Sequence, residues 1–198
     1  MNATYNARRG YSFTPDYPFA AAEQARVDGA FTGTTDQILQ WAACKWGIDE
    51  DVVRAQMAKE SWWDQRNEGD WWTYAAQDCP PGHAPGADGR PGECPQSLGI
   101  GQVRYSAGSP AFPGVEQSTA MNVDATYAIW RACFEGKETW LNQVERGRTY
   151  AKGDVWGCVG RWFAGRWYTQ PANDYIAAVQ SYLNQRIWTT QGFLGYKG

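Results

Sequence analysis

The chain has 198 residues, 43% of them hydrophobic, and a formal net charge of -3 at neutral pH. This length suits one domain with a substantial core, and the hydrophobic fraction excludes a wholly disordered chain. The weak negative charge argues against nucleic acid and anionic membrane surfaces as partners, because both attract basic proteins.

The first 33 residues have a composition unlike the rest of the chain. Residues 1–33 show neither helical nor strand periodicity and contain several Pro and Gly, which predicts an irregular N-terminal arm lying over a domain of residues 34–198. Their start, MNATYNARRG, lacks the hydrophobic segment of a signal peptide, so an exported chain would already have lost it. No apolar run approaches the roughly 20 residues that cross a bilayer, and we expect no membrane insertion.

Helical signals begin after the arm. Residues around Thr34 can cap a helix, and Gly47 stands where a left-handed glycine ends one. Asp49 can cap a second helix. Four positions of that helix recur at the spacing of one face, which is predicted to point inward: Val53, Met57, Glu60 and Asp64.

Residues 66–96 are predicted to form a loop-rich insertion. Cys79 and Cys94 bracket a segment rich in Pro and Gly, and a disulfide that closes such a loop contributes about 3 kcal/mol in the chain-entropy model. A second bridge among Cys44, Cys133 and Cys158 would leave one thiol free, and the sequence leaves this pairing open. The alternative is five reduced thiols in a cytosolic protein.

Neither a metal nor a cofactor is expected from the sequence. The five cysteines show no CxxC pairing, which disfavours a zinc site. His83 is the single histidine and lies in the Pro/Gly-rich loop, so we expect a solvated side chain and no Ser/His triad.

Helical spacing returns beyond the insertion. It predicts a helix from Asn122 to Gly136, shorter helices around residues 140–144 and 155–162, and a last helix over about residues 172–188. No sustained alternation of apolar and polar residues predicts a strand. The sequence therefore predicts a mostly α fold.

Glu60 lies on the inward face near the end of its helix and is followed by two tryptophans. Burial and the negative end of the helix dipole both raise the pKa of a carboxyl group. An acid protonated near neutral pH can donate a proton to the leaving oxygen of a glycosidic bond. The alternative is a structural ion pair with Lys45 or Arg54.

Aromatic residues make up 15% of the chain, with 12 Trp, 11 Tyr and 7 Phe. A core of this size does not require so many. Their flat faces can pack against sugars or serve a protein interface, and composition alone leaves both interpretations open.

Four segments in the same order resemble the soluble lytic transglycosylase family, which cuts peptidoglycan glycan strands. They are AKES at 58–61, SLGIGQV at 97–103, the helix opening at Asn122, and WFAGRW at 162–167 followed by DYIAAVQSYL. The resemblance covers about residues 34–188. It implies a lysozyme-like helical domain of the goose-type lysozyme and lytic transglycosylase kind, with the disulfide-closed insertion added.

The resemblance also implies roles for individual residues. Glu60 would be the single catalytic acid between N-acetylmuramic acid and N-acetylglucosamine, and the product would be a 1,6-anhydro sugar. Ser61, Ser97 and Gln102 match the positions that line the substrate cleft. Tyr105 and Trp162 are predicted as further substrate contacts, the first through its ring and the second through its indole N–H.

The chain departs from the family pattern in three places. Gly101 replaces a methionine, Trp162-Phe163 replaces a Tyr-Asn pair near the acid, and Gln102 lies 42 positions after Glu60 because of the insertion. The insertion also supplies five spare carboxylates: Glu68, Asp70, Asp78, Asp88 and Glu93.

These departures leave two alternatives open. A spare carboxylate about 6.5–9.5 Å from Glu60 would make the protein an inverting muramidase. An inactive cleft would make it a glycan-binding protein. For the enzyme we expect a secreted or periplasmic monomer whose partner is the peptidoglycan glycan strand.

Overall fold

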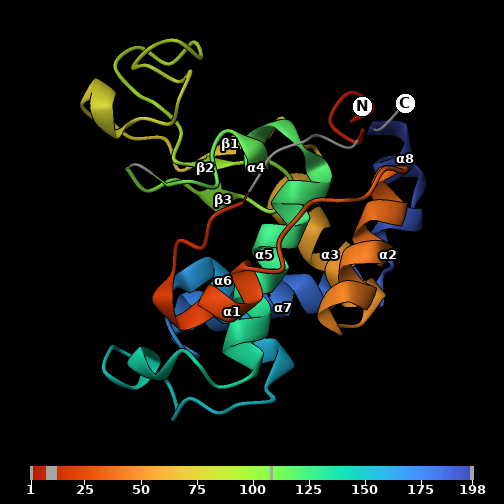
Figure 1. The fold of residues 1–198 in the computed structure, drawn as a ribbon. Coiled ribbons are helices and arrows are strands. Elements are labelled where there is room, and N and C mark those ends of the chain that lie inside the picture. Colours follow the sequence, from red (N-terminus) through yellow and green to blue (C-terminus); the bar gives the residue numbers. More distant parts are fainter. Residues whose placement is uncertain (1, 8–12, 108, 197–198) are drawn as a thin grey trace.

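The computed structural model describes residues 2–7, 13–107 and 109–196, and it confirms a mostly helical fold (Figure 1). Short 3-10 turns occur at Pro18–Ala20, Ala76–Asp78, Thr139–Asn142 and Ile187–Thr189. The helices are α1 (Ala21–Gln24), α2 (Thr35–Trp46), α3 (Glu50–Ser61), α4 (Gly114–Gln117), α5 (Thr119–Phe134), α6 (Val155–Ala164), α7 (Gln170–Asn184) and α8 (Gln191–Tyr196). The strands are β1 (Glu68–Gly69), β2 (Ser97–Leu98) and β3 (Val103–Arg104).

Helix α5 runs through the centre of the molecule, with the other long helices around it (Figure 1). Every residue of α5 except Arg131 and Phe134 is buried. A helix that is buried on all sides is a core helix, and burial of its apolar side chains is the main source of stability for the elements packed on it. The predicted start near Asn122 and end near Gly136 are confirmed within about one turn.

The predicted caps of α2 and α3 are confirmed. Thr34 and Gln37 form a reciprocal capping box, and Gly47 ends α2 in the left-handed conformation at φ 68°. Asp49 accepts hydrogen bonds from the N–H groups of Asp51 and Val52 at the start of α3. These local signals fix the length and direction of the helix that carries Glu60.

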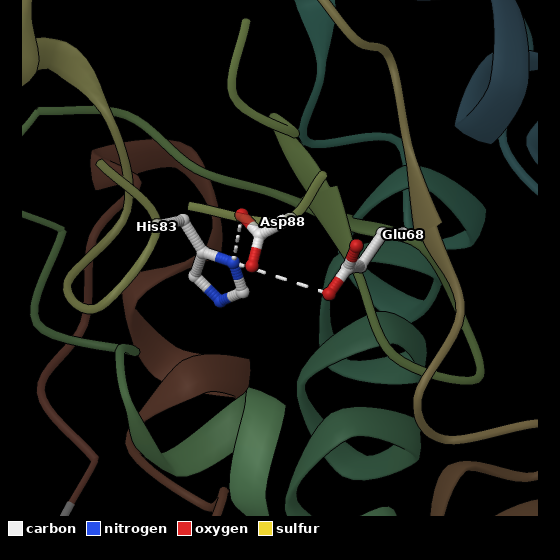
Figure 2. Close-up of side chains that lie close together, drawn as sticks. All are labelled: Glu68, His83 and Asp88. Atoms are coloured by element: carbon white, nitrogen blue, oxygen red, sulfur yellow. Dashed lines mark hydrogen bonds and ion pairs between the residues drawn. The ribbon is translucent and has the colours of Figure 1, made fainter. Parts of the chain in front are cut away.

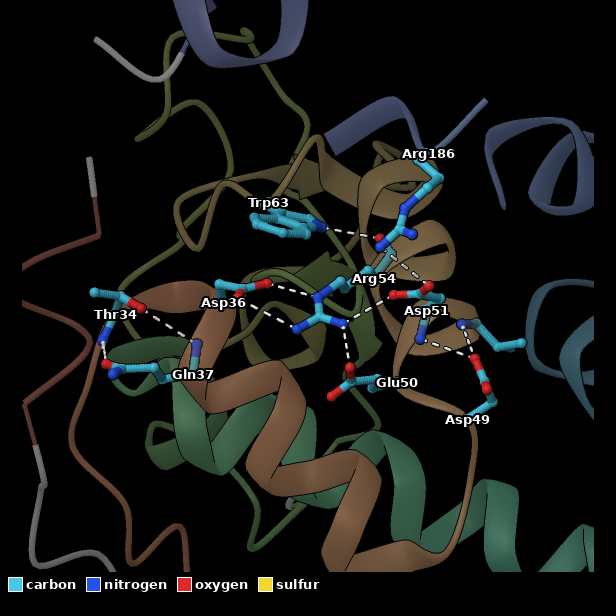
Figure 3. A network of polar contacts seen from close by, with 10 residues as sticks. Thr34, Asp36, Gln37, Asp49, Glu50, Asp51, Arg54, Trp63 and Arg186 are labelled. Carbon is cyan, nitrogen blue, oxygen red and sulfur yellow. Dashed lines mark hydrogen bonds and ion pairs between the residues drawn. The ribbon is translucent and has the colours of Figure 1, made fainter. Parts of the chain in front are cut away.

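The guanidinium of Arg54 fastens α3 to α2 (Figure 3). Its Nε lies 2.6 Å from Asp36 of α2, and its Nη1 lies 2.9 Å from Asp51 and 3.1 Å from Glu50. The Arg54 carbonyl accepts the indole N–H of Trp63 at 2.9 Å. The guanidinium of Arg54 therefore joins the two helices, and its backbone carbonyl holds the segment that follows α3.

Part of the arm that we expected to be irregular is helical. In α1, Gln24 is 1% exposed, and its Oε1 accepts the N–H groups of Asp16 and Tyr17. Glu23 is 4% exposed and forms an ion pair with Lys137. Periodicity gave no signal here because the buried positions are polar.

Two later helices differ from the prediction. The segment around residues 140–144 forms only the 3-10 turn Thr139–Asn142, because Leu141 is its one buried residue and offers too little apolar surface for a helix. Helix α7 begins at Gln170 and ends at Asn184, before the expected residue 188. Arg186 adopts a left-handed conformation at φ 43° and breaks the helix there.

A small antiparallel sheet in the order β1-β2-β3 lies beside the start of α5 (Figure 1). Asn122 of α5 fastens it: Nδ2 donates to the Leu98 carbonyl at 3.0 Å and the Val115 carbonyl at 2.8 Å, and Oδ1 accepts the Gly101 N–H at 2.8 Å. The side chain is fully buried. One amide thus sets the position of the β2–β3 turn relative to the core.

Two disulfides are present. The predicted Cys79–Cys94 bridge is confirmed, and Cys133–Cys158 joins α5 to α6, which leaves Cys44 as a free, exposed thiol. Disulfides persist in oxidising compartments, so these pairs indicate an extracytoplasmic environment. Within the residues that the structure describes, no helix is both long and apolar enough to cross a membrane.

We predict that Asn122→Ala lowers the free energy of unfolding by about 2–4 kcal/mol. The substitution removes the side chain that hydrogen-bonds the buried backbone groups of Leu98 and Gly101. Urea unfolding followed by circular dichroism measures the difference. A loss below about 0.5 kcal/mol, the range typical of surface substitutions, would contradict this role for Asn122.

Candidate active site

A cavity of about 590 Å3 lies between the arm, the end of α3, the small sheet, α6 and α7. Its lining combines rings and charges. The aromatic lining residues are Phe13, Tyr17, Trp162, Phe163 and Tyr175, and the charged ones are Asp16, Lys59, Glu60, Asp70, Arg104 and Arg161. An apolar wall with a few convergent polar groups is typical of a ligand site.

The end of α3 places Glu60 at this cavity. Trp62 caps the helix in the left-handed conformation at φ 57°, and its N–H donates to the Ala58 carbonyl at 2.9 Å. Trp63 follows at φ 62°, is 8% exposed, and packs edge-on against Phe193. The two tryptophans thus end the helix and anchor it to the C-terminal segment, which keeps the Glu60 carboxyl at the cavity wall.

The surroundings of Glu60 favour its protonated form. Burial raises the pKa of the Glu60 carboxyl to about 7, and the nearby negative charge of Asp70 adds to the rise. A hydrogen bond from the Tyr175 hydroxyl and the charge of Lys59 act in the opposite direction. Desolvation is the largest of these effects, so the carboxyl can hold its proton near neutral pH.

Neither cation considered as a partner of Glu60 pairs with it. Arg54 forms ion pairs with the carboxylates of Asp36, Glu50 and Asp51 (Figure 3). Lys45 Nζ lies 2.8 Å from Asp124 and 3.0 Å from Asp28. An ion pair with Arg54 or Lys45 is therefore excluded as the reason for the position of Glu60.

Tyr175 is the functional residue that the sequence reasoning missed. It is 3% exposed, donates to Glu60 Oε1, and its ring stacks on Phe163 at 4.7 Å between centroids. Burial raises the pKa of the Tyr175 hydroxyl well above its ordinary value, so it remains a donor. The sequence contained a signal for the burial of Tyr175, because the residue lies one turn before Val179 on the buried face of α7.

The turn that contains Ser97 and Gln102 also reaches the cavity. Gly99 has a φ of 81°, and a Cβ there would lie 2.2 Å from Asn122 Nδ2, so both backbone and space require glycine. Gln102 Nε2 donates to the carbonyls of Gly99 at 2.9 Å and Asn67 at 3.1 Å. Gln102 therefore lines the cavity while its amide N–H groups hold the turn.

Ser61 and Trp162 hold the same turn from two helices. Ser61 is 7% exposed, and its Oγ donates to the Ile100 carbonyl at 2.8 Å, so it supports the cavity wall rather than lining it. Trp162 lines the cavity, and its indole N–H donates to the Gly101 carbonyl at 3.0 Å. Tyr105 packs edge-on against Phe112 and does not belong to the lining.

Among the five spare carboxylates of the insertion, only Asp70 lines the cavity that holds Glu60. Ser97 Oγ donates to Asp70 Oδ2 at 2.5 Å, and Arg104 Nη1 lies 3.2 Å from the same oxygen. The predicted substrate contact Ser97 thus orients a carboxylate. Asp70 also adopts the left-handed backbone conformation, with a φ of 53°, which costs free energy for a residue other than glycine.

The expectation that His83 is solvated is wrong. The residue is 7% exposed, and Asp88, Glu68 and Glu116 surround its ring. The Pro/Gly-rich loop folds back on β1 and α4, which the sequence pattern could not indicate.

No protein-family model, curated protein or solved structure matches this chain. The chemical interpretation of the cavity therefore rests on its own residues.

We predict a pH-dependent stability difference between wild type and Glu60→Gln. The folded state raises the pKa of Glu60 from 4.5 to about 7, so it binds the proton more tightly than the unfolded state, and ionisation above pH 4.5 progressively destabilises the wild type. Glu60→Gln lacks this ionisation.

The expected gain in unfolding free energy for Glu60→Gln is absent below pH 4.5, grows up to about pH 7 and then levels off, at no more than about 3 kcal/mol. Urea unfolding at pH 4, 6 and 8 measures it. A difference that is constant with pH would show that Glu60 ionises normally in the folded protein.

Proposed function

We propose that this protein cleaves the β-1,4 bond between N-acetylmuramic acid and N-acetylglucosamine in peptidoglycan, as a lytic transglycosylase with Glu60 as the single catalytic acid. The observation that carries the proposal is a carboxyl with a pKa of about 7 at the wall of a 590 Å3 cavity. A protonated carboxyl at that position can protonate the bridging oxygen, and the resulting carboxylate can then act as the base.

The proposed reaction needs one protein carboxylate. The substrate's own N-acetyl carbonyl assists the bond cleavage, and its 6-hydroxyl closes the ring when the Glu60 carboxylate accepts the proton of that hydroxyl. We propose the lysozyme-like fold that the sequence motifs imply together with this reaction. Ser61, Trp162 and Gln102 support it by holding the turn beside the acid.

The lining fits the chemistry of a glycan strand. Trp162 and Phe163 offer flat faces for sugar rings, and Phe163 is 57% exposed. Lys59 and the exposed Arg104 line the same cavity and suit the carboxylates of the lactyl group and the stem peptide, whereas Arg161 is paired with the buried Glu138. With two disulfides, the protein is proposed to work as a secreted or periplasmic monomer.

A second candidate is an inverting muramidase, and Asp70 favours it. Asp70 lines the cavity with Glu60 and is close enough to raise its pKa. In that mechanism Asp70 would activate a water molecule on the face of the sugar opposite Glu60. The product distinguishes the two candidates, since anhydro ends are lighter than hydrolysed reducing ends by one water.

We predict that Glu60→Gln lowers the rate of peptidoglycan cleavage by at least about 10²–10⁴-fold, because the proton donor is lost. Digestion of purified sacculi, with fragments separated and weighed by mass spectrometry, gives the rate. Glu93→Gln, a carboxylate of the insertion outside the cavity, serves as the control.

Undiminished cleavage by folded Glu60→Gln would contradict the assignment. Binding of sacculi by the wild type without any cleavage would instead identify a glycan-binding protein.

We further predict that Asp70→Asn lowers the rate by less than about tenfold. In the proposed mechanism Asp70 is not a general base, and loss of a general base would lower the rate by about 10²–10⁴-fold. Loss of the Asp70 charge should also lower the pKa of Glu60 and move the alkaline limb of the pH profile to lower pH. Asp78→Asn is the matched control in the same insertion. A collapse of activity in Asp70→Asn, together with reducing-end products from wild type, would favour the inverting muramidase.

A further inference from the structure

A buried histidine lies among carboxylates outside the lining of the cavity that holds Glu60, and Figure 2 shows it with Asp88 and Glu68. His83 and Asp88 belong to the loop that the Cys79–Cys94 disulfide closes, whereas Glu68 belongs to β1. Three ligand atoms, one from each of these residues, lie within 4.8 Å of one another. A second cavity of about 80 Å3 adjoins the cluster and is lined by Glu68 and His83.

The distances in the cluster leave the three ligand atoms near enough to share one cation. His83 Nδ1 lies 3.0 Å from Asp88 Oδ2 and 4.0 Å from Glu68 Oε1. Ligands on one tetrahedral Zn²⁺ with bonds of about 2.0–2.1 Å lie roughly 3.3 Å apart. The observed separations bracket this spacing, so small side-chain movements would bring all three atoms to one ion.

The other ring nitrogen of His83 supplies an independent observation. Nε2 lies 3.4 Å from Glu116 Oε1 of α4. Histidines that ligate a metal usually donate their second N–H to a carboxylate, which fixes the ring and turns the opposite lone pair to the metal. In the neutral ring that donates Nε2–H to Glu116, the Nδ1 lone pair faces the Asp88 and Glu68 carboxylates, and a cation between them would replace the proton that Nδ1 otherwise carries.

The charges favour the same conclusion. Three carboxylates surround one imidazole, which supplies at most one positive charge, whereas a divalent cation supplies two. Arg66, which lines the adjoining cavity, is paired with Asp64 at 3.0 Å. The set of one imidazole nitrogen and two carboxylate oxygens suits Zn²⁺ and its first-row neighbours better than Ca²⁺ or Mg²⁺.

We propose that His83, Asp88 and Glu68 bind a divalent first-row transition metal ion, represented by Zn²⁺, and that Glu116 positions the histidine. No metal was expected from the sequence, because the ligands come from separate segments and include one histidine. The ion would be structural: it would tie the disulfide-closed loop to β1, the strand that immediately precedes Asp70.

The test uses the full chain carrying Cys44→Ser, which removes the free thiol as a competing ligand. After removal of metal with EDTA, Zn²⁺ is titrated by calorimetry, and thermal unfolding is recorded with and without the ion. We expect one Zn²⁺ per chain. At about 100-fold excess over Kd, the unfolding midpoint should rise by about 5–10 °C.

Variants locate the ion. Asp88→Asn and Glu68→Gln should each abolish the Zn²⁺-dependent shift, and Glu116→Gln should weaken affinity about 10–100-fold. Asp78→Asn, in the same insertion but outside the cluster, should bind as the parent does. Because Asp88→Asn and Glu68→Gln remove negative charge from an acidic cluster, both should still show a cooperative unfolding transition without metal.

Three results would overturn the proposal. They are no Zn²⁺ binding by the parent, Zn²⁺ binding that survives both Asp88→Asn and Glu68→Gln, and a preference for Ca²⁺ over Zn²⁺. The first would leave His83 as an ion-pair partner of the three carboxylates, the second would place the ion elsewhere on the chain, and the third would contradict the ligand chemistry assigned to the cluster.

Discussion

The structure depends on one constraint, the burial of the Glu60 carboxyl without a cation to neutralise it. The neighbouring charges that could have paired with it are bound elsewhere: Arg54 to carboxylates of α2 and α3, and Lys45 to Asp124 and Asp28. At the carboxyl are the Tyr175 hydroxyl, the charge of Lys59, which lowers the pKa of Glu60 by less than burial raises it, and the wall of a cavity. A group in these surroundings retains its proton at a pH where an ordinary glutamate has lost it.

The surrounding elements are arranged so that this carboxyl keeps its place. Left-handed Trp62 ends α3 two residues after Glu60, and the fully buried Asn122 fixes the Gly99–Gln102 turn beside it. Ser61 and Trp162 donate to the backbone of the same turn from α3 and α6. The wall of the cavity is thus held by hydrogen bonds to backbone carbonyls, which leaves the Gln102 side-chain oxygen and the aromatic faces for a ligand.

Local signals predicted much of this from the sequence. The capping box at Thr34, the cap at Asp49 and the apolar spacing of α5 act within a few residues, and so does the Pro/Gly-rich loop that Cys79 and Cys94 close. Contacts between distant segments were not predictable. Tyr175 meets Glu60 across 115 positions, and the loop around His83 folds onto Glu116, because tertiary packing alone brings them together. The lysozyme-like fold stays a prediction.

The most direct test of the central claim is a titration of the Glu60 carboxyl itself. Carbon-13 NMR of protein labelled at the glutamate side-chain carboxyl follows each group through pH, and the signal absent from Glu60→Gln identifies Glu60. The account predicts a midpoint of about 7. A midpoint near 4.3, the ordinary value for glutamate, would show that the carboxyl is charged at neutral pH, and the proposed proton donor would be lost.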